Sequence, residues 1–156
     1  MQAEKLQFIS MGFVPLLQTI SADTMGKWGK MNAQQMTEHV SGFFKVSTGK
    51  IKFPVVTAAE HLPKYKEFLL SDKEFRENTK APGNVVPDEP GPIKNISMAA
   101  ASEELQQEID HFVQYFKDHP GTKTAHPVFG ELDFDEWVLL HYKHLMHHAK
   151  QFGLVC

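Results

Sequence analysis

Four of the nine histidines in this 156-residue chain lie within eight residues, in the run His-Tyr-Lys-His-Leu-Met-His-His at 141–148. On a helical wheel of 100° per residue, His141, His144 and His148 lie within a narrow arc, at about 40°, 340° and 20°. Lys143 falls opposite this arc. The apolar residues on the same arc are Trp137, Leu145, Phe152 and Val155. The imidazoles therefore face the expected core, where both ring nitrogens need partners, and a metal ion is one such partner.

The spacing of these histidines suits metal ligation. Residues four apart on a helix have β-carbons about 5–6 Å apart, so His144 and His148 can converge on one ion at about 2.0–2.1 Å if it is zinc. His141 and His144, three apart, could do the same. The third ligand should come from a facing helix, and His39 is the other histidine on a predicted inward stripe. Three imidazoles leave coordination positions for water or substrate, as in a reactive site.

Other interpretations of these residues stay open at this point. The histidines could be core residues of a metal-free protein. His141 could orient a bound water or simply pack, and Gln151 could support a ligand or be an ordinary polar helix-end residue. A zinc-protease helix is excluded because Leu145 follows His144 where Glu is required. The sequence also lacks a Gly-rich phosphate loop and a Gly-x-Ser-x-Gly nucleophile motif.

Composition narrows the classes of function. The net charge of −3 and the scattered lysines and arginines give no basis for nucleic-acid binding. The only cysteine, Cys156, cannot form an internal disulfide. No signal peptide and no apolar run of about 18 residues are found. We therefore expect a cytoplasmic protein with one domain, residues 1–156.

Four helices must position these side chains. Apolar residues at helical spacing predict helices over 2–20, 33–46, 98–117 and 134–152. Pro15 should kink the first or shift its boundary. The N-terminal signals are Asn32 with Gln35, Ser97, and Asp133 with Glu136.

The long connection over 47–96 holds six of the nine prolines. It suits a crossover along a bundle rather than a tight turn. A short helix is expected over 64–70, which could extend through Phe75, and irregular chain over 79–95. No strand is predicted, since the best segment, 51–56, is broken by Pro54. The fold class expected is all-α, a four-helix bundle with a long crossover between helices 2 and 3.

The runs Gln-Met-Thr-Glu-His-Val at 35–40 and His-Leu-Met-His-His-Ala-Lys-Gln at 144–151 resemble those of the DinB-like (YfiT-like) metal-binding helical bundles. In that family the last helix carries His-x-x-x-His followed shortly by Gln, and the second helix supplies one histidine. Segments 28–31, 126–130 and 151–153 resemble a functionally uncharacterised branch. The resemblance covers nearly the whole chain, because the order and spacing of the four helices also fit.

This resemblance implies a divalent ion, zinc or nickel, held by His39, His144 and His148. Characterised relatives include thiol-dependent transferases and isomerases acting with mycothiol, bacillithiol or glutathione, and others are called metal-dependent hydrolases. The chain has Ala149-Lys150 where the family usually has Arg-Gly, and 47–96 resembles an insertion. Both departures leave the thiol partner open.

The function expected is that of a metal-dependent enzyme, a hydrolase or a thiol transferase, which activates water or a small thiol against a small-molecule substrate. His141 and Gln151 are candidates for supporting the ligands. The alternative is a non-catalytic, metal-stabilised binding or dimerisation module, with a homodimer formed through the first helix.

Overall fold

The computed structural model describes residues 2–79, 86–87 and 89–155, so that Cys156 and part of the 79–95 stretch lie outside it. The described chain is mostly helical, with one two-stranded sheet. The elements are α1 (Gln2–Gln7), the π-helical turn η1 (Phe8–Gly12), α2 (Phe13–Leu17), α3 (Ala33–Ser47), the 3-10 turn η2 (Ala59–His61), α4 (Leu62–Leu70), α5 (Met98–Asp118), β1 (Thr124–His126), β2 (Gly130–Leu132) and α6 (Phe134–Gln151).

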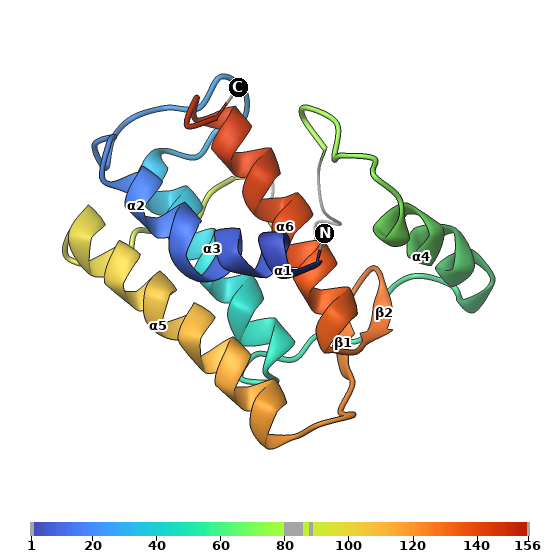
Figure 1. The fold of residues 1–156 in the computed structure, drawn as a ribbon. Helices are drawn as coiled ribbons and strands as arrows, with labels where there is room; N and C mark the ends of the chain where they lie inside the picture. Colours follow the sequence, from blue (N-terminus) through green and yellow to red (C-terminus); the bar gives the residue numbers. More distant parts are fainter. Residues whose placement is uncertain (1, 80–85, 88, 156) are drawn as a thin grey trace.

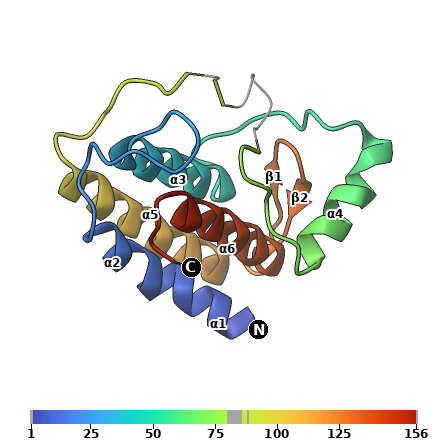
Figure 2. The ribbon, with the colours of Figure 1, turned by 90° about the horizontal axis from the view of Figure 1, so that it is seen from above.

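Helix α6 lies at the centre of the arrangement. It packs against α1 and η1 on one side, α3 on another and α4 on a third, while α3 and α5 form the most extensive helix pair. Figure 2 shows α6 between α3 and the α1–α2 rod, with the hairpin and α4 beside its N-terminal half. The connection between α3 and α5 runs out to α4 and returns (Figure 1).

The predicted starts of the main helices are confirmed by their caps. At α3, the Asn32 side chain accepts from the Gln35 N–H at 2.8 Å and the Gln35 side chain accepts from the Asn32 N–H at 2.9 Å. The same reciprocal capping box joins Asp133 and Glu136 at α6. These bonds satisfy backbone donors that a helix start leaves without partners.

The continuous first helix predicted over 2–20 is wrong in detail, because its middle turn is π-helical and it ends at Leu17. The Phe13 N–H donates to the Phe8 carbonyl, five residues earlier. This wider turn comes just before Pro15, which has no N–H to offer the preceding turn. Within it, the Ser10 carbonyl accepts from the Gln106 side chain of α5 at 3.1 Å.

The small β-hairpin is the element that the sequence did not predict. Strands β1 and β2 pair antiparallel, with His126 opposite Gly130. Each strand has only three residues, too few for an alternating pattern to appear. The segment 51–56, the best strand candidate, is not a strand, although the Val56 N–H donates to the Pro127 carbonyl at 2.7 Å.

Thr124 of this hairpin joins the two helices that carry the histidines. Its Oγ1 accepts from the Trp137 Nε1 of α6 at 2.7 Å and donates to the Ser47 carbonyl at the end of α3, also at 2.7 Å. One hydroxyl thus connects the start of α6 to the end of α3.

Lys143, predicted to face away from the core, is buried at 8% exposure. Its ammonium donates to the Ser71 carbonyl at 2.7 Å and to the Lys73 carbonyl, and lies 4.9 Å from the Phe68 ring centroid. The crossover therefore folds back onto α6 and covers its second face. Helix α4, Leu62–Leu70, confirms the predicted short helix but does not reach Phe75.

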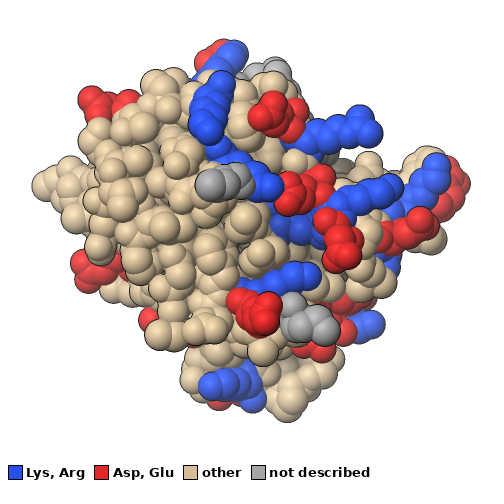
Figure 3. All heavy atoms as spheres, turned by 45° about the horizontal axis from the view of Figure 1, so that its top comes forward, with Lys and Arg blue, Asp and Glu red and all other residues tan. Residues whose placement is uncertain are grey.

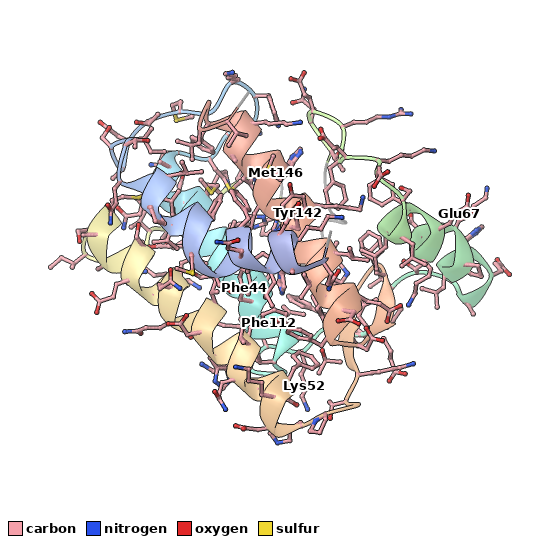
Figure 4. All side chains as sticks on the ribbon, in the orientation of Figure 1. Phe44, Lys52, Glu67, Phe112, Tyr142 and Met146 are labelled. Carbon is pink, nitrogen blue, oxygen red and sulfur yellow. The ribbon has the colours of Figure 1, made fainter. Side chains whose placement is uncertain are left out.

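The core between α3, α5 and α6 is aromatic. Phe44 and Phe112 point toward one another there (Figure 4), with ring centroids 5.7 Å apart in an edge-to-face arrangement. None of the helices in the described part of the chain has the length and hydropathy that crossing a membrane requires.

We expect Thr124→Val to lower the free energy of unfolding by about 2–4 kcal/mol. The substitution leaves both the Trp137 N–H and the Ser47 carbonyl without their partner, and each unpaired buried group costs about 1–3 kcal/mol. Urea unfolding measures the change. Thr122→Val is the matched control, since the Thr122 hydroxyl makes no hydrogen bond within the described residues; an equal loss in both variants would contradict the role of Thr124.

Candidate metal centre

The three predicted ligands come together between α3 and α6. The Nε2 atoms of His39 and His144 are 3.1 Å apart, and those of His148 and His144 are 3.0 Å apart. One ligand nitrogen from each residue lies within 4.8 Å of the other two. Nitrogens bound tetrahedrally to zinc at about 2.0–2.1 Å are separated by roughly 3.3 Å. The spacing therefore needs only small side-chain shifts to hold an ion.

The protonation of His148 is set by Gln151. The Gln151 side-chain Nε2 donates to the Trp28 carbonyl at 2.8 Å, so its Oε1 is the atom that faces His148. That oxygen accepts from the His148 Nδ1 at 2.7 Å. In a neutral imidazole only one nitrogen carries the proton. The Nε2 that faces the other two histidines therefore has a free lone pair.

Burial keeps all three imidazoles neutral. Desolvation, with a smaller contribution from His147, lowers the pKa of His39 to about 4. Burial and the neighbouring imidazoles hold the pKa values of His144 and His148 well below the usual 6.5. Neutral imidazoles are the form that binds metal.

The donor set fits a divalent transition ion. Three neutral nitrogens suit zinc, nickel, copper, iron or cobalt, and no carboxylate or thiol of the described residues joins the group. His39 and His144 are partly exposed, whereas His148 is buried. Three protein ligands would leave a coordination position of the ion for water or a small molecule.

Aromatic rings flank the three histidines. The Phe43 ring presents its edge to His39 and His144, with centroids 5.2 and 5.3 Å away. On the other side, His147 lies 5.1 Å from His148 and 5.5 Å from the Trp28 ring. His147 is a half-buried neighbour rather than a member of the converging group, as its position on the wheel predicts.

His141 packs in the core instead of joining the three. Its ring stacks on Phe44 at 3.8 Å and on Trp137 at 5.2 Å, and meets the edge of Phe112 at 4.9 Å. Its exposure is 2%, and its Nε2 has no hydrogen-bond partner among the described residues. His141 therefore packs among core aromatic rings, one helical turn before His144 in α6.

His126 lies in β1 and is buried. Its Nδ1 accepts from the N–H groups of Val128 and Phe129 at 3.0 and 3.2 Å, and its ring stacks on Phe43 at 5.7 Å. Burial lowers the pKa of His126 to about 3. The tight turn that creates these bonds had one sequence signal, the His-Pro-Val-Phe-Gly run at 126–130.

The sequence analysis did not predict the bond from Gln151 to Trp28 either. The acceptor of that bond is the Trp28 backbone carbonyl, which no pattern of side chains identifies. The other histidines lie outside the group: His61 is exposed, and His111 and His119 contact Tyr115.

Comparison with known proteins gives one match. A family model described as "Protein of unknown function (DUF1569)" matches residues 16–153. No curated protein and no solved structure matches the chain.

We expect untagged protein to bind about one divalent ion per chain and His39→Ala to lose it, because the substitution removes the only ligand from α3. Elemental mass spectrometry after loading with zinc or nickel measures the ratio. His61→Ala serves as the control because that side chain is exposed. Equal metal content in wild type and His39→Ala would remove His39 from the site.

The metal-free protein should lose stability as the pH falls below about 6.5. Unfolded histidine takes up a proton near pH 6.5, whereas folded His39 and His126 stay neutral to pH values of about 4 and 3. The unfolded state therefore binds more protons, and each such histidine lowers the free energy of unfolding by about 1.4 kcal/mol per pH unit in this window.

Urea unfolding from about pH 7 to pH 5 in the presence of a chelator measures this slope. His126→Gln should reduce the slope by about one histidine's share, even if its stability at pH 7 is lower. A slope that His126→Gln does not alter would mean that His126 titrates normally in the folded protein.

Proposed function

The chain belongs to the DUF1569 family, and we propose that it is a metal-dependent enzyme that activates a small thiol or a water molecule against a small electrophilic substrate. The observation that carries the proposal is the convergence of three neutral imidazoles from α3 and α6, with no fourth ligand among the described residues. A structural zinc site would be closed by four ligands, whereas three ligands with an open side are typical of catalytic sites.

The residues present would hold a divalent ion through the Nε2 atoms of His39, His144 and His148. Such an ion, when bound, acidifies a thiol or water that occupies the remaining position. The three imidazoles add no negative charge, so the full charge of the ion acts on that molecule. The Phe43 ring packs nearly perpendicular to the rings of two of these histidines, His39 and His144.

The lack of a nearby carboxylate base favours the thiol over water as nucleophile. Glu38 precedes His39 but accepts from the Lys94 and Asn95 N–H groups, at 2.9 and 2.8 Å, so it is committed to the start of α5. The converging group itself contains no carboxylate among the described residues. A thiol that coordinates an ion is deprotonated outright and needs no protein base.

The proposal includes the fold type. We assign α1–α2, α3, α5 and α6 to a four-helix bundle of the DinB-like kind, with residues 48–97 as its long crossover. The element order, the packing of α6 against α1 and α3, and a histidine from the second helix with two from the last support this assignment.

A small molecule is the proposed substrate rather than a nucleic acid. The net charge is −3, and on the face shown in Figure 3 lysines and arginines alternate with acidic residues over one half. Nucleic-acid binding draws on a continuous basic surface, which neither observation provides.

Zinc- or nickel-loaded protein should transfer glutathione, bacillithiol or mycothiol to an electrophilic aromatic substrate, and His148→Ala should abolish the metal-dependent rate. Loss of a Lewis acid worth several kcal/mol corresponds to a decrease of roughly 100-fold or more. A spectrophotometric assay with each thiol, and a parallel ester-hydrolysis assay, measure the rates.

His61→Ala is the control for this assay and should keep the wild-type rate. Hydrolysis without thiol transfer would select water as the nucleophile. Stoichiometric metal binding with neither activity in any assay would favour the non-catalytic binding module.

A further inference from the structure

Gln151 connects His148 to the loop that precedes α3. Its side-chain Oε1 accepts from the His148 Nδ1, its side-chain Nε2 donates to the Trp28 carbonyl, and its own carbonyl accepts from the Lys27 N–H at 2.7 Å. Gln151 is 3% exposed. The side-chain oxygen of Gln151 therefore bonds to a predicted metal ligand, and its side-chain nitrogen and backbone carbonyl bond to the 26–29 loop.

The loop approaches Gln151 so closely that two of its positions require glycine. A β-carbon on Gly26 would lie 2.8 Å from the Gln151 Cγ, and one on Gly29 would lie 2.8 Å from its Nε2. Gly29 also has φ of +81°, which side chains other than glycine rarely adopt. The loop backbone thus lies directly against the Gln151 side chain, with no room for a β-carbon between them.

The loop touches the histidine helix at a second point. The Trp28 ring lies 5.5 Å from the ring of His147, which in turn lies 5.1 Å from His148. Trp28 therefore contacts the last turn of α6 twice, through its carbonyl at Gln151 and through its ring at His147. Movement of the loop would release both at once.

We propose that Gln151 is a positioning residue that fixes the His148 tautomer for metal binding and couples metal occupancy to docking of the 26–29 loop. The inference rests on the metal site of the proposed function. An amide has one acceptor and one donor end, and here the two ends bind different partners, since the oxygen holds the Nδ1 proton of His148 and the nitrogen holds the loop. Partners of this kind orient metal-bound histidines, and their loss typically costs about 10- to 100-fold in metal affinity.

The coupling must act in both directions. If a docked loop holds Gln151 in the orientation that prepares His148, then metal binding to His148 stabilises the docked loop by the same factor. The Lys27 N–H, bonded to the Gln151 carbonyl, should consequently exchange with solvent more slowly in the metal-loaded protein than in the metal-free protein.

Two substitutions of Gln151 separate its contact with His148 from its contact with the loop. Gln151→Glu keeps an acceptor for the His148 Nδ1 proton but cannot donate to the Trp28 carbonyl. Gln151→Leu can do neither. Gln114→Leu is the matched control, because Gln114 is exposed and bonds only to Asp118 within the described residues.

The experiment measures zinc affinity by competition with a chelator and amide exchange by mass spectrometry, on the full chain with and without zinc. Gln151→Leu should bind zinc about 10- to 100-fold more weakly than wild type, whereas Gln151→Glu should bind within a few-fold of it. Zinc should slow exchange at Lys27 in wild type and in the control, but in neither Gln151 variant. Circular dichroism checks that each variant is folded.

Four outcomes would overturn the inference in whole or in part. Wild-type zinc affinity in folded Gln151→Leu would remove its positioning role while leaving the proposed function intact. Zinc binding by wild type with no change at Lys27 would remove the coupling to the loop. No zinc binding by wild type would reject the proposed function together with this inference. If Gln151→Leu does not fold, loss of zinc binding in Gln151→Glu decides against the tautomer role.

Discussion

The convergence of three imidazoles is the constraint on which the rest of this structure depends: the His144 Nε2 lies about 3 Å from the Nε2 atoms of both His39 and His148. Neutral imidazoles offer lone pairs in this arrangement, and lone pairs that face one another need a shared proton or a cation between them. Burial disfavours extra protons, since it lowers the pKa values of all three rings. The proposed divalent ion would supply the positive charge that this arrangement needs.

Several features outside the three histidines serve to hold α3 and α6 in register. The Thr124 hydroxyl joins the Trp137 indole to the end of α3 at one end of the helix pair, and Gln151 joins α6 to the loop before α3 at the other end. His144 and His148 lie between these two ties. The site is thus framed at both ends by polar bonds in an otherwise apolar interior, where such bonds are most costly to break.

The core next to the three histidines is aromatic and contains two further imidazoles, those of His126 and His141. Phe43 separates the ligand rings from His126, and His141 is enclosed by Phe44, Phe112 and Trp137. Aromatic packing of this kind restricts the orientation of the enclosed rings and lowers the local dielectric constant. A lower dielectric constant strengthens any charge interaction at the three histidines. In the described structure, His126 and His141 are buried core residues that pack against aromatic rings.

The sequence by itself determined the local features of the protein. The capping boxes at Asn32 and Asp133 fixed where two helices begin, and the four-residue spacing of His144 and His148 placed both on one helical face, because these properties depend on neighbours within one or two turns. The inward stripe of α3 placed His39 on the face that meets them.

Only the tertiary structure decided the features that join distant parts of the chain. The burial of Lys143 by the returning crossover, the bond from Gln106 to the carbonyl of Ser10, and the packing of His126 on Phe43 each depend on partners far away in sequence. His39 and His144 themselves are 105 residues apart. Periodicity shows which face of an element is apolar, but it does not show which element covers that face, because long-range packing is chosen by the whole chain.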